Sequence, residues 1–347
     1  MSAPSRSRDP AMDALRVLAI VMVVVIHCAS YGLSAPMGSF RWWSALSWAS
    51  LVRPAVPLFF LCSGALMLGR DIPLRRLYLH NILRIVIAMY FWAFLYRLYH
   101  LLAAGDVSAA SLFEAVKHML LLHHEFHFYF LHILLLVYVC LPVTRSFVRN
   151  ASRREVEYAL AVWFVTGILF PLIKDFWPFT LVYDIPSRYL INGAWSSVGY
   201  GLLGWYLREY GGTIARRRYW AALALGFAVT FGGCAAASLG SGALAENFLS
   251  GWSPGPMLMS FGVFGLAVTV WRWPERLTKI TGGLAKGAFC VSLVHVFFLI
   301  LFQDHGFTAA RFHPLWAIPV IAGAVLALSY AVYLVLRRIP LVKTWLI

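Results

Sequence analysis

Apolar residues gather in ten long runs that are separated by short polar connections. The runs cover residues 14–33, 52–69, 78–103, 126–147, 157–174, 191–208, 218–239, 256–272, 285–303 and 315–336. As helices, such runs have about the length that crosses the hydrocarbon core of a bilayer, roughly 30 Å thick. We therefore expect an all-α, polytopic integral membrane protein with about ten transmembrane helices. It should form a single domain over residues 1–347, with a short N-terminal tail over residues 1–11.

The first run carries two ionisable residues within otherwise apolar sequence, Arg16 at one end and His27 at the other. Eleven residues make about three helical turns, which places both side chains on one face, roughly 16 Å apart. An ionisable group inside a membrane indicates a functional site, although a lone imidazole also bonds structurally to a neighbouring helix. A basic leader before an apolar run is also typical of a signal peptide, but the equally apolar remainder favours an uncleaved span.

Composition and charge support the membrane assignment. The chain is 61% hydrophobic and 12% charged, whereas soluble domains carry about 25% charged residues. The net charge of +15 would suggest nucleic-acid binding in a soluble protein, but here the basic residues lie in short loops. Of 29 Lys and Arg residues, 21 fall on the N-terminal side of the alternating runs, 7 fall on the other side, and Arg84 lies within the third run. This bias predicts that both termini are cytoplasmic, and we expect no nucleic-acid partner.

Several other segments have distinctive compositions. The outward segments Ser34–Ser50 and Lys174–Leu190 are rich in aromatic residues, which predicts loops that form an interfacial aromatic belt or a stacking platform for a sugar. Segment Ser108–His124 has the apolar spacing of an amphipathic helix lying on the outer interface. The sixth run, 191–208, is rich in Gly and Ser, which is typical of close helix packing in lipid.

Metal and nucleotide chemistry have little support in the sequence. The five cysteines all lie in apolar runs and form no CxxC pair, so we interpret them as small buried side chains. His123, His124 and His127 cluster, but Glu125 is the only nearby carboxylate, and we expect no metal site. The nucleotide-binding GxxxxGK[ST] and zinc-binding HExxH motifs do not occur.

Five blocks together resemble a known family. They are DALRVLAIVMVVVIH from Asp13, RPAVPLFFLCSGALMLG from Arg53, FHFYFLHILLLVYVCLP from Phe126, the stretch from Asn192 to Gly204, and FCVSLVH from Phe289. In this order they resemble the acyltransferase-3 family of membrane O-acyltransferases, and its branch similar to the enterobacterial common antigen O-acetyltransferase. The sequence departs from the family pattern at Asn81, where Arg is usual, at Tyr129, where Trp is usual, and at Ser292, where Tyr is usual.

The resemblance implies an enzyme of the bacterial inner membrane. It would move an acetyl group from cytoplasmic acetyl-CoA, used as co-substrate without a metal, to a hydroxyl of a cell-surface or secreted polysaccharide or its lipid-linked precursor. His27 matches the family's histidine and would act as a general base or as a transient carrier of the acetyl group. His127 and His295 would line the same cavity, or would only make structural hydrogen bonds.

The resemblance also suggests binding residues. Arg16, Arg75, Arg76 and Arg84 lie at the cytoplasmic ends of the first three runs, and guanidinium groups suit the phosphates of CoA. Positive-inside charge alone is the other explanation for inward arginines. On the outward side, Arg53, Glu125 and Asn192 are candidates for contact with the acceptor glycan.

Two functions of other classes remain open from the sequence. A transporter that exports glycans or small molecules would also use about ten spans with intramembrane His and Arg. Transporters commonly contain internal repeats with broken helices, and no repeat is evident here. A glycan polymerase would be expected to carry a large outward loop, whereas the longest outward segments have only about twenty residues.

Overall fold

The computed structural model describes residues 9–123, 125–189, 192–269 and 273–347, and its regular elements there are all helices. The α-helices are α1 (Pro10–Gly32), α2 (Phe40–Leu51), α3 (Ala55–Met67), α4 (Leu74–Arg76), α5 (Leu83–Ala104), α6 (Ala109–Leu120), α7 (Tyr129–Asn150), α8 (Arg153–Trp163), α9 (Phe170–Ile173), α10 (Ile185–Arg188), α11 (Gly193–Tyr210), α12 (Arg216–Ser241), α13 (Pro254–Thr269), α14 (Glu275–Leu284), α15 (Ala288–Asp304), α16 (Pro314–Leu336) and α17 (Pro340–Trp345). Two π-helical segments (Leu77–Ile82 and Phe164–Leu169) and four 3₁₀ turns (Phe126–Phe128, Phe179–Val182, Gly211–Thr213 and Glu246–Leu249) complete the described elements.

The predicted all-α, polytopic membrane architecture is confirmed, with fewer full-length spans than expected. In the described ranges, seven helical stretches are long and apolar enough to cross a membrane. An eighth is counted if α14 and α15, which meet at a 59° bend, form one broken span. The two other predicted spans correspond to α11 and α13. Of these, α13 has only 16 residues, and the sequence of the continuous helix α11 contains several Gly, Ser and charged residues that lower its hydropathy.

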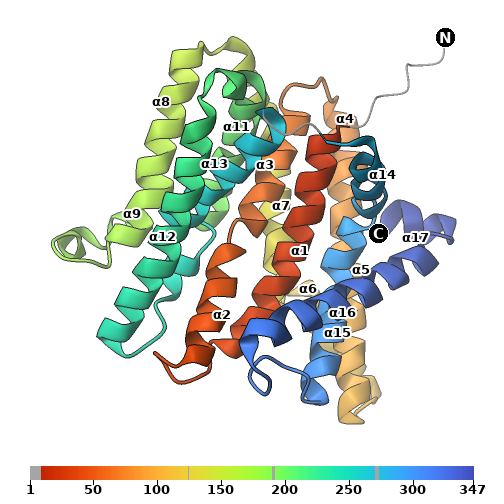
Figure 1. The fold of residues 1–347 in the computed structure, drawn as a ribbon. Helices are drawn as coiled ribbons and strands as arrows, with labels where there is room; N and C mark the ends of the chain where they lie inside the picture. Colours follow the sequence, from red (N-terminus) through yellow and green to blue (C-terminus); the bar gives the residue numbers. More distant parts are fainter. Residues whose placement is uncertain (1–8, 124, 190–191, 270–272) are drawn as a thin grey trace.

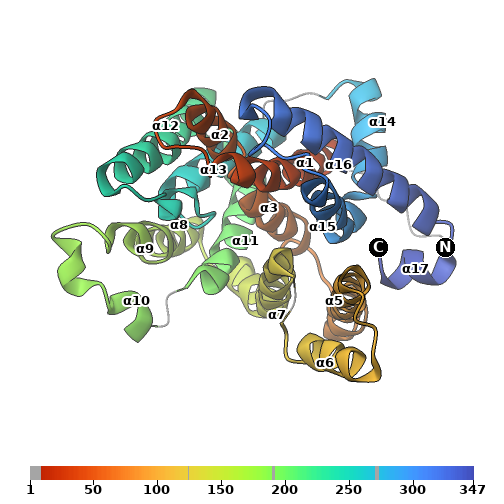
Figure 2. The ribbon, with the colours of Figure 1, turned by 90° about the horizontal axis from the view of Figure 1, so that it is seen from below.

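Helix α1 lies at the centre of the bundle. It contacts α2, α3, α13, α14, α15 and α16, and two views show it between the halves of the molecule (Figures 1 and 2). Helices α8, α11, α12 and α13 lie on one side, and α5, α15, α16 and α17 on the other. The Asp9 side chain caps α1 by accepting a hydrogen bond from the Met12 amide at 3.3 Å, and Pro10 fits the first helical position.

The predicted inward segments meet at the end of the bundle where α1 begins, called the inner end below; the opposite end is the outer end. Arg149 forms an ion pair with Asp71 at 3.1 Å, and Arg208 forms one with Asp9 at 3.0 Å. The Arg145 guanidinium donates to the carbonyl oxygen of Ile72 at 2.9 Å. These contacts join connections that are distant in sequence, as the alternating charge pattern requires.

The prediction of an outward loop over Ser34–Ser50 is wrong, because most of it forms helix α2. Ser39 caps this helix by accepting from the Trp42 amide at 3.2 Å. Trp42 is fully buried against Trp43 and Leu46 and does not lie in an interfacial belt. The three tryptophans of this segment are therefore largely packing residues. The second aromatic segment differs: Trp177 is 82% exposed, so both interpretations of that segment stay open.

The predicted amphipathic helix over Ser108–His124 is present as α6, which packs on α5. Ser108 caps it through a reciprocal pair of hydrogen bonds with Ser111. One flank is apolar and exposed, with Phe113 68% accessible, as expected of a helix that meets the membrane interface. His124 lies outside the described residues.

Helices α3 and α11 approach closely because glycines line their contact, as the Gly-rich run predicts. A Cβ atom placed on Gly204 would lie 2.0 Å from the carbonyl oxygen of Leu61. A Cβ atom on Gly64 would lie 1.8 Å from the carbonyl oxygen of Gly201. Neither position has room for a side chain unless the backbones separate. Small residues thus allow the backbones of α3 and α11 to pack directly against each other.

We expect Gly204→Leu to separate α3 from α11 and to destabilise the protein by at least about 1–3 kcal/mol, the usual cost of overpacking. Thermal unfolding of the purified protein in detergent should show a midpoint several degrees lower. Gly232→Leu is the matched control, because Gly232 also lies within a helix, α12, but has open space around its Cβ position. Equal midpoints for both variants would contradict the close-packing interpretation.

Candidate functional site

The structure brings together the three histidines that the sequence suggested, from three separate elements. His27 lies in the outer half of α1, His127 in the turn before α7, and His295 in α15. The rings of His27 and His295 stack with centroids 5.3 Å apart and an interplanar angle of 26°. The rings of His127 and His295 are also 5.3 Å apart, at 76°. The His27 imidazole therefore faces other side chains of the bundle interior.

The hydrogen bonds around the three histidines show which of their ring nitrogens have no partner. Nδ1 of His295 lies 3.0 Å from the carbonyl oxygen of Val291. A carbonyl oxygen only accepts, so Nδ1 carries the proton, and Nε2 of a neutral His295 keeps its lone pair. That Nε2 atom and both ring nitrogens of His127 are buried without a hydrogen-bond partner among the described residues. Buried, unpaired polar atoms are rare in proteins and indicate a functional site or an unplaced ligand.

Tyr96 of α5 supports the histidines from one side. Its ring lies 5.2 Å from that of His127 and stacks on Phe297 with centroids 3.7 Å apart. Its hydroxyl donates to the carbonyl oxygen of Leu293 at 2.9 Å. Tyr96 is fully buried, so it fixes the position of α15 relative to the 3₁₀ turn that carries His127.

Three cavities follow one another along this face of α1. A central chamber of about 50 Å³ is lined by all three histidines. An inner cavity of about 570 Å³ shares Phe59, Phe130 and Ser292 with the chamber. An outer cavity of about 720 Å³ shares His27 with it. His27 thus lies where the chamber meets the outer cavity, and Arg16, on the same helix, lines the inner cavity.

The inner cavity is strongly basic. Its lining contains five Lys or Arg side chains and one carboxylate: Arg16, Arg70, Arg76, Arg84, Lys286 and Asp71. Of the four arginines that the sequence suggested for the donor, three line this cavity, whereas Arg75 does not. Arg75 and Arg76 lie at the end of α4, just before a π-helical segment. Asn81, within that segment, also lines the cavity. π-helical turns often occur at functional sites.

Two arginines of the inner cavity differ in their surroundings. Arg84 donates to the carbonyl oxygen of Ile347, and its Cζ atom lies 5.6 Å from the centre of the Phe289 ring. Arg16 has neither a hydrogen-bonded partner nor an ion pair in the part of the chain that the structure describes. The Arg16 guanidinium is therefore available for an anion in the cavity.

Comparison with protein-family models decides the family. The model of the acyltransferase-3 family, described as an acyltransferase domain, matches residues 9–334. The chain belongs to the acyltransferase-3 family. No curated protein and no solved structure matches the chain significantly. The protein is therefore a multi-pass membrane acyltransferase, and its chemistry must be inferred from its own cavities.

Of the three predicted acceptor residues, Glu125 lines the outer cavity of the acyltransferase, whereas Arg53 and Asn192 do not. Oε1 of Glu125 accepts a hydrogen bond from Nε2 of His100 at 2.9 Å. Arg53 lies in the short connection between α2 and α3. The Nε atom of Arg53 is buried without a hydrogen-bond partner among the described residues.

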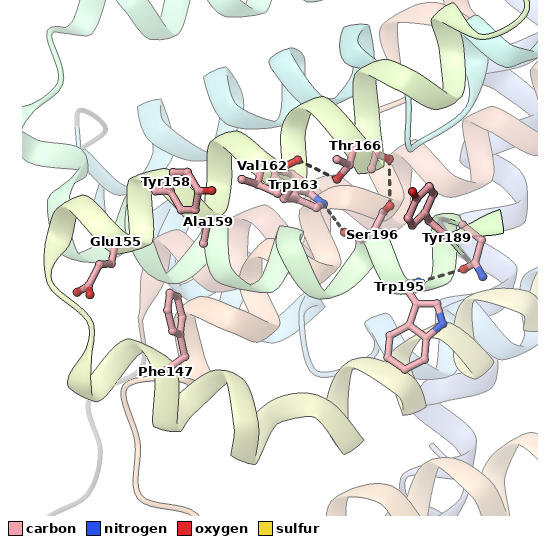
Figure 3. A pocket seen from close by; sticks show the side chains of 12 residues that line it. Phe147, Glu155, Tyr158, Ala159, Val162, Trp163, Thr166, Tyr189, Trp195 and Ser196 are labelled. Atoms are coloured by element: carbon pink, nitrogen blue, oxygen red, sulfur yellow. Dashed lines mark hydrogen bonds between the residues drawn. The ribbon is translucent and has the colours of Figure 1, made fainter. Parts of the chain in front are cut away.

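Asn192 does not join this group. Its side chain accepts from the Trp195 amide at 3.2 Å and so caps α11. It lines a separate cavity of about 870 Å³ along α8 and α11. In Figure 3, Trp195 and Tyr189 lie near one end of this cavity and Glu155 lies at the other end. The structure thus gives Asn192 a local role in helix capping and separates it from the histidines.

Four residues that line or support the site are not predicted as functional residues from the sequence. Ser292 lines both the chamber and the inner cavity, and it was noticed only as a departure from the family pattern. Tyr96 lies within an apolar run without a local motif. Arg70 and Lys286 were counted only as inward charges. A helical projection of α15 would have placed Ser292 near His295, since residues three apart share a face.

Among the described residues, the histidines just before α7 in the sequence do not form one cluster with His127. His123 pairs with His118, with their Nδ1 atoms 2.9 Å apart, and does not face His127. Among the described residues, no group of three or more His, Cys, Asp or Glu side chains is arranged to hold a metal ion. The five cysteines are unpaired, and four of them are buried.

Proposed function

We propose that this acyltransferase moves an acetyl group from acetyl-CoA, bound at the inner end, to a hydroxyl group of a glycan that enters from the outer end. The acceptor would be a cell-surface or secreted polysaccharide or its lipid-linked precursor, and the location would be the bacterial inner membrane. The resemblance to the enterobacterial common antigen branch supports the acetyl group and the glycan acceptor. Family membership favours acyl transfer over the export of glycans or small molecules.

The observation that carries this proposal is the position of His27 between two cavities. The inner cavity shares the wall residues Phe59, Phe130 and Ser292 with the histidine chamber, and the outer cavity shares His27 with it. A donor and an acceptor that approach from opposite ends of the bundle would therefore meet at one imidazole. Such an arrangement allows transfer across most of the membrane thickness without passage of the whole CoA molecule.

The inner cavity suits the CoA portion of the donor. Acetyl-CoA carries several negative charges on its phosphates, and charge-assisted hydrogen bonds from guanidinium groups are the strong ones. The cavity has an excess of basic side chains, with Arg16 available and Arg76 and Lys286 in its lining. Its volume of about 570 Å³ is in the range of small-molecule and cofactor sites.

The small chamber supports a short acyl group. At about 50 Å³ it has room for one or two water molecules, since a water occupies about 30 Å³ of the liquid. An acetyl group is of this size, whereas a long acyl chain is not. The chamber walls are mainly aromatic and aliphatic, which would exclude water from the thioester and limit its hydrolysis.

Two reaction sequences are compatible with this arrangement of histidines. As a general base, His27 takes the proton of the acceptor hydroxyl while the oxygen attacks the thioester carbonyl. The carbon–sulfur bond breaks, the ester forms, and the proton passes to the thiolate of CoA. As an acyl carrier, the imidazole attacks the thioester first: a ring nitrogen bonds to the carbonyl carbon, the carbon–sulfur bond breaks, and the ring N–H proton leaves with the CoA thiolate. The acceptor oxygen then takes the acetyl group, and the hydroxyl proton returns to the imidazole. His295, stacked on His27, would hold the ring in position.

Membrane vesicles of known orientation provide the test. Acetyl-CoA is added to inside-out vesicles, and the acceptor glycan is enclosed in the lumen. We expect release of free CoA and acetylated glycan, both detected by mass spectrometry, only in vesicles that contain the protein. Right-side-out vesicles, in which the donor cannot reach the inner cavity, serve as the control. Glycan acetylation that is independent of the protein, or equal in both orientations, would contradict the proposal.

A further inference from the structure

The two large cavities on this face of α1 carry opposite charges. The inner cavity has the basic lining described above, whereas the outer cavity contains two carboxylates, Glu125 and Asp304. No Lys or Arg is present among the described residues that line the outer cavity. The nearby Arg97 is directed elsewhere and donates to the carbonyl oxygen of His123. The lining of the outer cavity is therefore acidic, whereas that of the inner cavity is basic.

The remaining walls of the outer cavity are aromatic or neutral and polar. Tyr31, Tyr99 and Phe126 provide flat apolar surfaces, against which the C–H face of a sugar ring can pack. The Tyr31 hydroxyl donates to Oε1 of Gln303 at 2.7 Å, which leaves the Gln303 amide NH₂ group free to donate to a sugar oxygen. His27 closes the inner side of this cavity.

The two carboxylates of the outer cavity differ in whether a basic side chain pairs with them. Glu125 is only 16% exposed and pairs with His100 at 2.9 Å. Asp304, the last residue of α15, is exposed and forms no ion pair with the described residues. The uncompensated charge of this cavity is therefore that of Asp304, while the charge of Glu125 depends on its imidazole partner.

We propose that the outer cavity accepts a sugar unit without negative charge and rejects uronic acids and other anionic sugars. This inference rests on the proposed function, because it names the class of acceptor for the same reaction. An anionic sugar placed about 10 Å from Asp304 would be repelled by enough to lower binding about tenfold at the effective dielectric constants typical near protein surfaces. Salt should weaken this discrimination, since the cavity is open to solvent.

The test compares matched acceptors in vesicles supplied with acetyl-CoA. Neutral methyl glycosides of the gluco, galacto and manno configurations are each paired with the corresponding methyl uronoside. We expect kcat/KM for at least one neutral glycoside to exceed that for its uronoside about tenfold or more, and the ratio to fall at high ionic strength. Asp304→Lys should raise the ratio of kcat/KM for the uronoside to kcat/KM for the neutral glycoside at least about tenfold, because it replaces a repulsion by an attraction.

Asp184→Lys is the matched control, because it makes the same charge change on the outer segment before α11, outside the cavity. It breaks only an exposed pair with Arg188, and the acceptor preference should stay as in the unmodified protein. Equal or better use of the uronosides would overturn the inference and leave the proposed function standing. Failure of every glycoside to increase CoA release, with donor binding intact, would overturn both.

Discussion

Replacement of His27 by Ala is expected to abolish acyl transfer and leave the protein folded in the membrane. Among the described residues, His27 alone lines both the chamber and the outer cavity, so both proposed sequences of steps pass through its imidazole. Loss of a general base typically costs about 10²–10⁴-fold in rate, and loss of a nucleophile costs at least as much. We expect kcat to fall by about three orders of magnitude or more.

The measurement is initial-rate CoA release and glycan acetylation in vesicles, normalised to the amount of inserted protein. His305→Ala is the matched control. His305 lies just beyond α15, and its Nδ1 atom contacts the carbonyl oxygen of Leu301 at 2.8 Å, which repeats the local geometry of His295. Because His305 is exposed and lines neither the chamber nor the outer cavity, this variant should keep its activity. Transfer by the His27→Ala protein at more than a tenth of the unmodified rate would contradict the role of His27.

The same proteins separate the two chemical roles of His27. If the imidazole carries the acetyl group, the unmodified protein should exchange isotope-labelled CoA into acetyl-CoA without any acceptor, and His27→Ala should not. If His27 acts only as a base, neither protein should catalyse this exchange, although the unmodified protein still transfers acetyl groups to the glycan.

The helices of this protein could be predicted from the sequence far better than the tertiary contacts between them. Apolar run length identifies a membrane helix because the bilayer fixes the length that is needed. The pairing of Arg16 with His27 also followed from spacing, since one helix connects them. The convergence of His127 with His295 could not be derived in this way. These residues come from different helices, and only tertiary packing brings their rings to 5.3 Å.

The differences between the expected and the observed positions have local physical causes. The segment before α3 has the aromatic composition of an interfacial loop, yet Ser39 caps a helix there and Trp42 enters the core. Arg75 and Arg76 are neighbours in sequence, but successive residues of a helix point about 100° apart. Only Arg76 therefore lines the inner cavity. Asn192 belongs to a block that resembles the family, but its amide is used to cap α11.

Arg16→Ala is expected to weaken the binding of acetyl-CoA and to leave the rate of the chemical step largely unchanged. Arg16 lines the inner cavity without a partner among the described residues, so its guanidinium should bind a phosphate of CoA. Hydrogen bonds to charged groups contribute about 1.5–3 kcal/mol, which corresponds to an increase of roughly 10- to 100-fold in KM for acetyl-CoA. Because the interaction is the same in the ground and transition states, kcat should change little.

A donor without phosphates isolates this effect. Acetyl-pantetheine carries the thioester but none of the phosphate charges, so its KM, already high, should be the same for the Arg16→Ala and the unmodified protein. Arg217→Ala is the matched control, because Arg217 is an exposed arginine at the inner end of α12 that does not line the cavity. An Arg16→Ala protein with an unchanged KM for acetyl-CoA, or with an equal loss for both donors, would show that Arg16 contributes only positive-inside charge or packing. The two donors thus separate recognition of the CoA phosphates from the general basic character of this end of the molecule.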